Sequence, residues 1–234
     1  MKPLGETMHE RTLKTGTVRM RAHQLMRRVF GRLFVYERFF VFKTDTKKVH
    51  FSTEKSAGLT VRLAKSEDIR RLQRLAKFND GMAQQRLNAG HLCFVALNSG
   101  SLANYAWFCF HEGYIDELET KIRVTPGSVY RYDVFTLPAY RGRGIFPSAF
   151  EESSKYLSQN DIKEMYGLVD SNNSPMLRVY EKAGIASQKI GDVTYIRLLN
   201  WRRYVFRGTT HADQDKLLEM FSDGQEPEHY TRAR

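Results

Sequence analysis

The chain has 234 residues, of which 41% are hydrophobic and 12% aromatic. This composition is ordinary for a globular protein and argues against wholesale disorder, and the length suits one sizeable domain with appended segments. No apolar run approaches the ~20 residues of a membrane-spanning helix, and the first 16 residues lack the apolar segment of a secretory signal. Cys93 and Cys109 are the only cysteines, and neither they nor the seven histidines have metal-binding spacing. We therefore expect a cytoplasmic protein in a reducing compartment, without a metal.

The formal net charge of +11 is concentrated near the start of the chain. Residues 1–58 contain 13 lysines and arginines against 5 acidic residues, so this first quarter accounts for most of the excess. Such asymmetry fits an anionic partner, which would be a membrane surface, nucleic acid or a phosphorylated ligand. It fits equally well a solvated basic face that has no partner.

Residues 17–37 have the pattern of an amphipathic helix, with apolar residues on one half of the helical wheel and arginines on the other. The apolar half contains Leu25, Met26, Val29, Phe30, Leu33 and Phe34. This basic helix either makes a peripheral contact with a membrane surface or packs against its own domain. A strand is predicted next at 38–43, and the polar run 44–48 ends it.

From residue 59 the pattern changes to alternating strands and helices, which predicts a mixed α/β domain over 59–200. Two helices are predicted at 145–157 and 175–182, and another begins with Ser66 as its N-cap and acidic residues in its first turn. Strands are predicted from apolar or alternating runs at 59–63, 91–97, 104–110, 130–137, 165–169, 186–189 and 193–199.

The remaining segments carry weaker patterns. Residues 98–101 form a hairpin-like turn between two of the predicted strands, and 111–129 is the least regular stretch of the domain. After residue 200 we expect a helix near 212–221. The polar end, 222–234, is predicted to be disordered.

The most informative segment, 132–147, has the pattern of a strand, a short turn with two glycines, and a helix start. Gly142 and Gly144 allow backbone N–H groups to approach an anion closely, and the N-terminus of the following helix favours negative charge. Arg141 and Arg143 would add charged hydrogen bonds to phosphate oxygens. Taken alone, this Arg-Gly-Arg-Gly pattern fits a solvated loop or a nucleic-acid contact as well as a phosphate site.

A second motif follows about thirty residues later, with Asn173, then Tyr180 seven positions on, then Glu-Lys-Ala-Gly. Together with the sequence Arg141-Gly142-Arg143-Gly144-Ile145, it resembles the two signatures of the GNAT superfamily of acyl-CoA N-acyltransferases, whose phosphate loop reads Gln/Arg-x-x-Gly-x-Gly/Ala. The resemblance covers about 140 residues. It implies a mixed, mostly antiparallel central sheet flanked by helices. Residues 1–58 would form an N-terminal helix–strand extension, and 201–234 a C-terminal helix and polar tail.

The resemblance also implies an activity, which is transfer of an acetyl group from acetyl-CoA, the co-substrate, to a primary amine by direct attack. The backbone of residues Val134, Phe135 and Thr136 would hold the pantetheine arm, and Asn173 would contact the cofactor. Tyr180, near the sulfur, would bind the cofactor and act as general acid for the leaving thiolate. The pyrophosphate would bind the backbone of Arg141, Gly142, Arg143, Gly144, Ile145 and Phe146.

One position departs from the family pattern, because Phe146 stands where the loop has Gly or Ala. Its ring has to point away from the phosphates or pack against the CoA chain, since otherwise the pocket is closed and the domain is inactive. Two other assignments have structural alternatives. In these alternatives Tyr180 only packs beside Met176 and Val179 and has no role as an acid, and Asn173 only caps its helix.

The general base is not identified by a motif. Glu117 and Glu119 lie in the irregular stretch, and Asp133 begins the central strand beside the expected acceptor channel. Each is a candidate to deprotonate an ammonium group, directly or through water. Tyr130 and Tyr132 are candidates to shape the acceptor pocket.

Two other functions stay open at this point. A catalytically inactive acyl-CoA sensor or scaffold would keep the same fold. A nucleic-acid-binding module would use the basic first quarter, but its aromatic residues fall on the apolar helix half or in a strand, so we expect no nucleic acid. The acceptor is a small-molecule or peptide amine, and the net charge would suit an anionic one such as a nucleotide-linked amino sugar.

Overall fold

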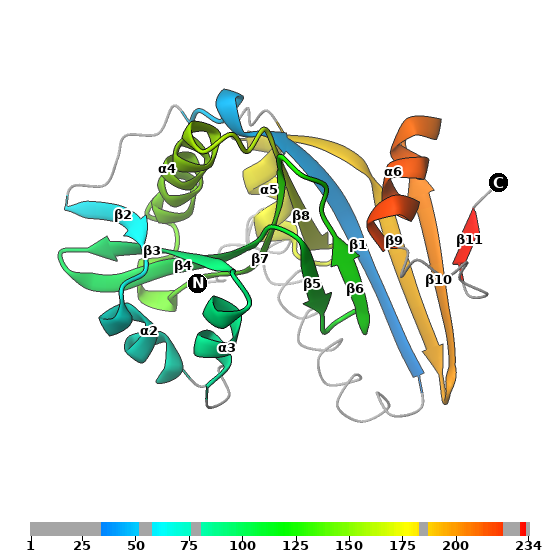
Figure 1. Cartoon of the computed structure of the whole chain (residues 1–234), viewed down its shortest axis with the longest axis horizontal. Helices are drawn as coiled ribbons and strands as arrows, with labels where there is room; N and C mark the ends of the chain where they lie inside the picture. The colour runs from blue at the N-terminus through cyan, green and yellow to red at the C-terminus, as the bar shows by residue number, and fades with distance from the viewer. Residues whose placement is uncertain (1–33, 52–57, 76–80, 183–186, 222–229, 233–234) are drawn as a thin grey trace, which may run out of the picture.

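The computed structural model describes residues 34–51, 58–75, 81–182, 187–221 and 230–232. These residues form a nine-stranded sheet in the order β11-β10-β9-β1-β8-β7-β4-β3-β2 and a separate hairpin, β5-β6 (Figure 1). The strands are β1 (Phe34–Asp45), β2 (Leu59–Leu63), β3 (Leu92–Asn98), β4 (Ser101–Cys109), β5 (Glu112–Ile115), β6 (Thr120–Arg123), β7 (Ser128–Thr136), β8 (Glu164–Asp170), β9 (Ser187–Leu198), β10 (Trp201–Gly208) and β11 (Tyr230–Arg232). The helices are α2 (Ser66–Gln73), α3 (Met82–Asn88), α4 (Ile145–Gln159), α5 (Ser174–Lys182) and α6 (His211–Phe221).

The sheet is mostly antiparallel, as predicted. Within the described strands, only the β7–β8 and β10–β11 pairs are parallel. Most predicted helices and strands after residue 59 lie within three residues of the observed ends. No helix in the described part of the chain is long and apolar enough to cross a membrane.

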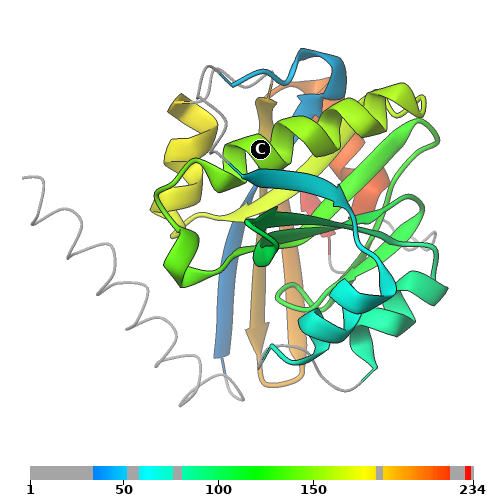
Figure 2. The same ribbon diagram turned by 90° about the vertical axis from the view of Figure 1, so that its left-hand side faces the viewer.

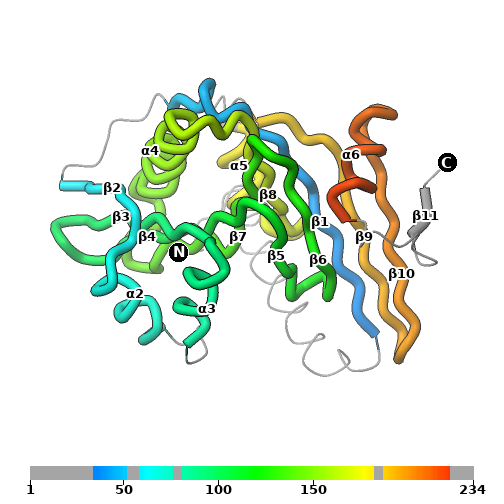
Figure 3. Tube along the Cα trace, viewed as in Figure 1, coloured from blue at the N-terminus to red at the C-terminus, as the bar shows by residue number. Residues whose placement is uncertain are grey.

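Strand β1 lies in the middle of the sheet, antiparallel to both β8 and β9 (Figure 3). Alternate side chains of β1 are buried, and Val41 is completely shielded from solvent. The predicted helix 17–37 is therefore wrong at its end, because 34–37 belong to β1; the rest of it lies outside the described residues. Period-two alternation at 34–37 was masked by the helical pattern before it, and pairing with β9 supplies the backbone partners of a strand.

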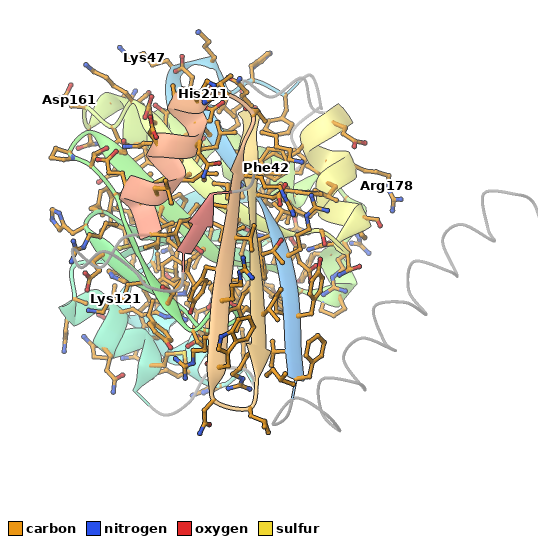
Figure 4. All side chains as sticks on the ribbon, turned by 90° about the vertical axis from the view of Figure 1, so that its right-hand side faces the viewer. Phe42, Lys47, Lys121, Asp161, Arg178 and His211 are labelled. Atoms are coloured by element: carbon orange, nitrogen blue, oxygen red, sulfur yellow. The ribbon has the colours of Figure 1, made fainter. Side chains whose placement is uncertain are left out.

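The sheet also crosses both expected domain limits. β1 precedes the limit at residue 59 and β10 follows the limit at residue 200, yet both are hydrogen-bonded to β9. α6 covers β9 and β10 (Figure 4, where His211 marks its start). The strands outside the expected domain are thus part of one continuous sheet.

Four local predictions are corrected. The stretch 111–129 contains the hairpin β5–β6, and the two short strands at 186–189 and 193–199 are one strand, β9. Lys65, not Ser66, is the N-cap of α2. Three residues of the predicted disordered end, Tyr230–Arg232, pair with β10. The causes differ. β9 and β11 are completed by pairing with β10, β5 and β6 are too short to show a period, and the Lys65 N–H is bound by the Asp68 carboxylate.

The two faces of the sheet are covered by different elements. Successive strand residues point to opposite faces, so on β7 the side chain of Val129 packs with Phe150 of α4, whereas Tyr130 packs with Ile115 and Leu118 of the hairpin region. We call the first side the α4 face; α4 and α5 cover it, and α4 crosses the strands in Figure 2. The second side, with α2, α3 and the hairpin, is the α3 face.

Candidate functional site

The parallel ladder between β7 and β8 stops part-way along both strands. It runs from Ser128–Glu164 to Arg131–Gly167. Beyond that pair, β8 stays with β1, whereas β7 follows β4 through a bulge at which Asp133 has a φ of 45°. The two strands therefore separate, and we call the opening after Arg131 and Gly167 the β7–β8 split.

The three residues expected to hold pantetheine form one edge of this split. Val134, Phe135 and Thr136 come directly after the bulge, and their other side is fixed to β4. The Asn104 amide donates to the carbonyl oxygen of Phe135 and to Oγ1 of Thr136, at 3.0 Å each. The strand edge that faces the split is thereby held in a fixed position.

The loop after β7 has the geometry of an anion site. Gly142 and Gly144 have φ angles of 74° and 70°, which side chains other than glycine's rarely allow. Gly144 is the N-cap of α4, and no side chain caps that helix. The first N–H groups of a helix lack partners within the helix, so α4 offers them to a ligand. Arg141 donates from Nε to the Thr136 carbonyl at 3.0 Å, which ties the loop to β7, and Arg143 is exposed.

The ring of Phe146 lies in the interior rather than in the loop. Its centroid is 5.8 Å from that of Phe150 and 5.4 Å from the guanidinium carbon of Arg131. The side chain thus packs between α4 and β7. An open pocket requires that the Phe146 ring does not point at the phosphates. The observed packing is compatible with that requirement.

Tyr180 lies on the α4 face, next to the end of the ladder. Its ring stacks on Phe42 of β1, with 4.4 Å between centroids, and its hydroxyl accepts a hydrogen bond from Nη2 of Arg131. Gly167 makes room for this contact, because a Cβ atom there would lie 3.3 Å from the Tyr180 hydroxyl. Tyr180 therefore does more than pack on its helix face.

Arg131 is a buried charge that the sequence analysis did not single out. Its side chain is 6% exposed, and Nη1 is buried without a hydrogen-bond partner. The guanidinium lies 3.7 Å from the ring centre of Phe150, and no carboxylate among the described residues pairs with it. Burial lowers the pKa of this guanidinium, which its hydrogen bond to Tyr180 opposes. A buried charge without a counterion is costly, so this arrangement indicates a function.

On the α3 face a pocket of ≈ 310 Å³ opens next to the same split. Tyr132 and Leu168, the residues directly after the last ladder pair, both line it. The other walls come from β1, α3, the end of β5 and the turn after β5. The split thus lies between a glycine-rich helix N-terminus on one face and a pocket on the other.

Of the three acidic candidates for a general base, two line the pocket and one does not. Asp133 lines the pocket and pairs with Nη1 of Arg86 at 2.5 Å. Glu117 also lines the pocket, on the exposed turn after β5. Glu119 is not part of the pocket lining, because it pairs with Arg197 at 2.8 Å and accepts a hydrogen bond from Tyr195 at 2.9 Å. The structure therefore brings two of the three candidates together.

Comparison with known protein families shows to which family the chain belongs. The acetyltransferase (GNAT) family matches residues 62–185, which is more than half of the chain. The chain belongs to this family. Both motifs of this GNAT protein, the loop at 141–146 and the segment from Asn173 to Tyr180, lie inside the matched residues, whereas β1 and β10 lie outside them.

Similar solved structures include a functionally unknown conserved protein from Staphylococcus epidermidis, with 13% identity, a TM-score of 0.48 and coverage of 74% of this chain and 65% of that one. A GCN5-related N-acetyltransferase from Kribbella flavida has 13% identity and a TM-score of 0.43 over 67% of this chain and 57% of that one. Arabidopsis thaliana NAA60 in complex with acetyl-CoA has 19% identity and a TM-score of 0.41 over 53% and 82%. The GNAT protein spans less than two thirds of the first two. No curated protein matches it.

Two polar residues of this GNAT protein have structural roles that the sequence left open or missed. Asn173 accepts a hydrogen bond from the Met176 N–H at 3.3 Å and so caps α5, while its amide nitrogen has no partner among the described residues. His91 was not singled out. Its Nδ1 lies 2.6 Å from the Tyr132 hydroxyl, and burial, together with the charge of Arg86, lowers its pKa. His91 thereby orients one wall of the pocket.

Proposed function

We propose that this GNAT protein transfers an acetyl group from acetyl-CoA to a primary amine, which attacks the thioester directly. The observation that carries the proposal is the β7–β8 split. It joins the uncapped N-terminus of α4 on one face to the ≈ 310 Å³ pocket on the other. Acetyl-CoA on the α4 face and the amine on the α3 face would meet at the split while each stays in its own site.

The donor would be held mainly by backbone groups. The N–H groups at 144–146 and the positive end of the α4 dipole favour a pyrophosphate. The edge of β7 at Val134, Phe135 and Thr136 would hydrogen-bond the pantetheine arm and direct the thioester to the split. The positioning of two reactants in this way supplies much of the acceleration in such a reaction.

Tyr180 would donate the proton that the leaving thiolate takes up. A tyrosine hydroxyl both donates and accepts one hydrogen bond easily. Because Nη2 of Arg131 donates to the oxygen of Tyr180, the hydroxyl hydrogen has to point in another direction and is available to the sulfur. Arg131 would thus act as a positioning residue, and its buried positive charge would favour the developing negative charge.

Asp133 is our candidate for the base. It stands two residues after the end of the ladder and lines the pocket, and Arg86 holds its carboxylate in place. It would take the proton from the ammonium form of the acceptor, directly or through one water. Glu117 lies farther along the pocket wall, on the turn after β5.

The proposal is tested by measuring release of the CoA thiol from acetyl-CoA in the presence of a panel of primary amines, with mass spectrometry of the amine products. We expect amine-dependent thiol release and a product heavier by one acetyl group. Acetyl-CoA binding with no thiol release above the amine-free rate would contradict transferase activity and would favour the inactive sensor instead.

A further inference from the structure

We infer that the acceptor is a primary amine carrying a second positive charge at its far end, and that the pocket on the α3 face recognises that charge. The inference rests on the proposed function, since it names the class of acceptor. It also reverses the expectation of an anionic acceptor, which the net charge of the whole chain suggested.

The lining of the pocket combines residues at the split with residues of an exposed turn. Tyr132 and Leu168 adjoin the point where β7 and β8 separate. Asp116 and Glu117, on the exposed turn after β5, form part of the opposite wall. An acceptor whose reactive amine lies at the split would therefore extend toward these two carboxylates.

The charges that line the pocket do not cancel. Among the described residues that line it, Arg86 is the one lysine or arginine, and it is already paired with Asp133. Asp116 and Glu117 make neither a hydrogen bond nor an ion pair with any described residue. Two carboxylates therefore remain uncompensated, although the protein as a whole is strongly basic. Local potential, not net charge, governs which ligand enters a pocket.

Tyr130 gives an independent indication of a ligand. Only 4% of this residue is exposed, it lines the pocket, and its hydroxyl has no hydrogen-bond partner among the described residues. The hydroxyl is not among the fully buried polar atoms without a partner, so it is open to the pocket and available to a ligand or a water. Its ring stacks on Tyr132, with 5.7 Å between centroids, and the two rings form an aromatic wall of the kind that attracts cations. Burial raises the Tyr130 pKa, and the charge of Glu117 raises it further.

A carboxylate or phosphate at the far end of the acceptor would meet Asp116 and Glu117, and like charges repel. A neutral alkyl end would leave both carboxylates without a partner. A second ammonium group satisfies both carboxylates.

The test uses three four-carbon amines whose far ends are positively charged, neutral and negatively charged: 1,4-diaminobutane, butylamine and 4-aminobutanoate. Each is titrated calorimetrically into the full chain saturated with CoA, so that binding is measured without turnover. We expect 1,4-diaminobutane to bind best and 4-aminobutanoate worst. One solvent-exposed charge pair contributes at most about a fivefold difference in affinity, and the difference should shrink as salt is added.

Two variants locate the effect. Glu117→Gln and Asp116→Asn should each bring 1,4-diaminobutane closer to butylamine by at most about fivefold. Glu112→Gln removes a carboxylate from the same hairpin outside the pocket. This control variant should change the affinity of neither 1,4-diaminobutane nor butylamine. Equal affinity for the three amines, preference for 4-aminobutanoate, or an unchanged preference in both pocket variants would overturn the inference. Failure of the proposed function would show separately, as a lack of amine-dependent thiol release from acetyl-CoA by the same protein.

Discussion

Arg131 and Tyr180 meet in an interior formed by aromatic rings of β1 and α4, and their hydrogen bond leaves the Tyr180 proton free to point elsewhere. Tyr180→Phe keeps the ring and removes only the hydroxyl. We expect kcat to fall about a hundredfold or more, as for the loss of a general acid, while the dissociation constant of acetyl-CoA changes little. Steady-state kinetics and calorimetry measure the two quantities.

Substitutions at Arg131 separate positioning from packing. Arg131→Met should lower kcat in the same direction as Tyr180→Phe, and Arg131→Lys should restore part of it, because lysine keeps the charge and a donor. Tyr36→Phe removes a hydroxyl from an exposed ring and serves as the control. Wild-type kcat in Tyr180→Phe, or no recovery with lysine in a folded protein, would contradict these roles.

At this scale the sequence predicted the residues that belong to a local motif and missed those defined by the fold. Gly144 and Tyr180 were singled out because the family motifs to which they belong consist of residues close together in the sequence. Arg131 was missed because only the β7 alternation, seen beside buried Val129, shows that it points inward. Which of the acidic candidates share a pocket follows from pairing between distant strands, which no local pattern contains.

The start of α2 depends on one buried carboxylate. Asp68 is fully buried, accepts a hydrogen bond from the Lys65 N–H at 2.8 Å and pairs with Arg62 at 2.5 Å. Burial alone would raise its pKa, but the hydrogen bonds from Arg62 and Lys65 outweigh it, so the pKa lies below its usual value of 3.8. The ionised side chain therefore stabilises the helix start.

We expect Asp68→Asn to lower the free energy of unfolding by roughly 2 kcal/mol at pH 7. Because the folded-state pKa is lowered, this stabilisation is present above the unfolded value and is lost as the pH falls through the folded value. The gap between wild type and variant in urea unfolding should thus narrow below about pH 4. Glu67→Gln, at the exposed neighbour, is the control; a gap that stays constant with pH would contradict the assignment.

Elements with a strong local period were predicted well. Elements whose apolar pattern is interrupted or too short to show a period were not. β9 was divided in two because Gly191-Asp192 interrupts its apolar pattern. The glycine is required there, since a Cβ atom would lie 2.2 Å from the Arg207 carbonyl oxygen on β10. β5 and β6 are four residues each, too short to show a period.

The position of β1 determines how the whole molecule is built. A strand from the beginning of the chain lies between β8 and β9, so the sheet on one side of the split depends on it. The sequence predicted a strand at 38–43 but could not predict its partners, because strand pairing over more than a hundred residues leaves no local pattern.

A fragment of residues 59–200, the expected domain, lacks β1 and β10, and we expect it not to fold cooperatively. In the full chain, Val41→Asp should cost more than about 4 kcal/mol, since it buries an unpaired charge. Lys43→Gln, at a partly exposed position on the same strand, should cost far less. Thermal unfolding followed by circular dichroism measures both; a stable fragment 59–200 with native unfolding would show that β1 is dispensable.

The proposed function depends on the loop before α4, which we expect to bind the pyrophosphate of acetyl-CoA. The most direct measurement is a calorimetric titration of the full chain with acetyl-CoA, beside the double variant Arg141→Glu and Gly144→Asp, in which aspartate tolerates the left-handed backbone and adds negative charge. We predict micromolar affinity for the wild-type protein and no measurable binding by a folded variant. No binding by the wild type, or equal binding by the variant, would contradict the account.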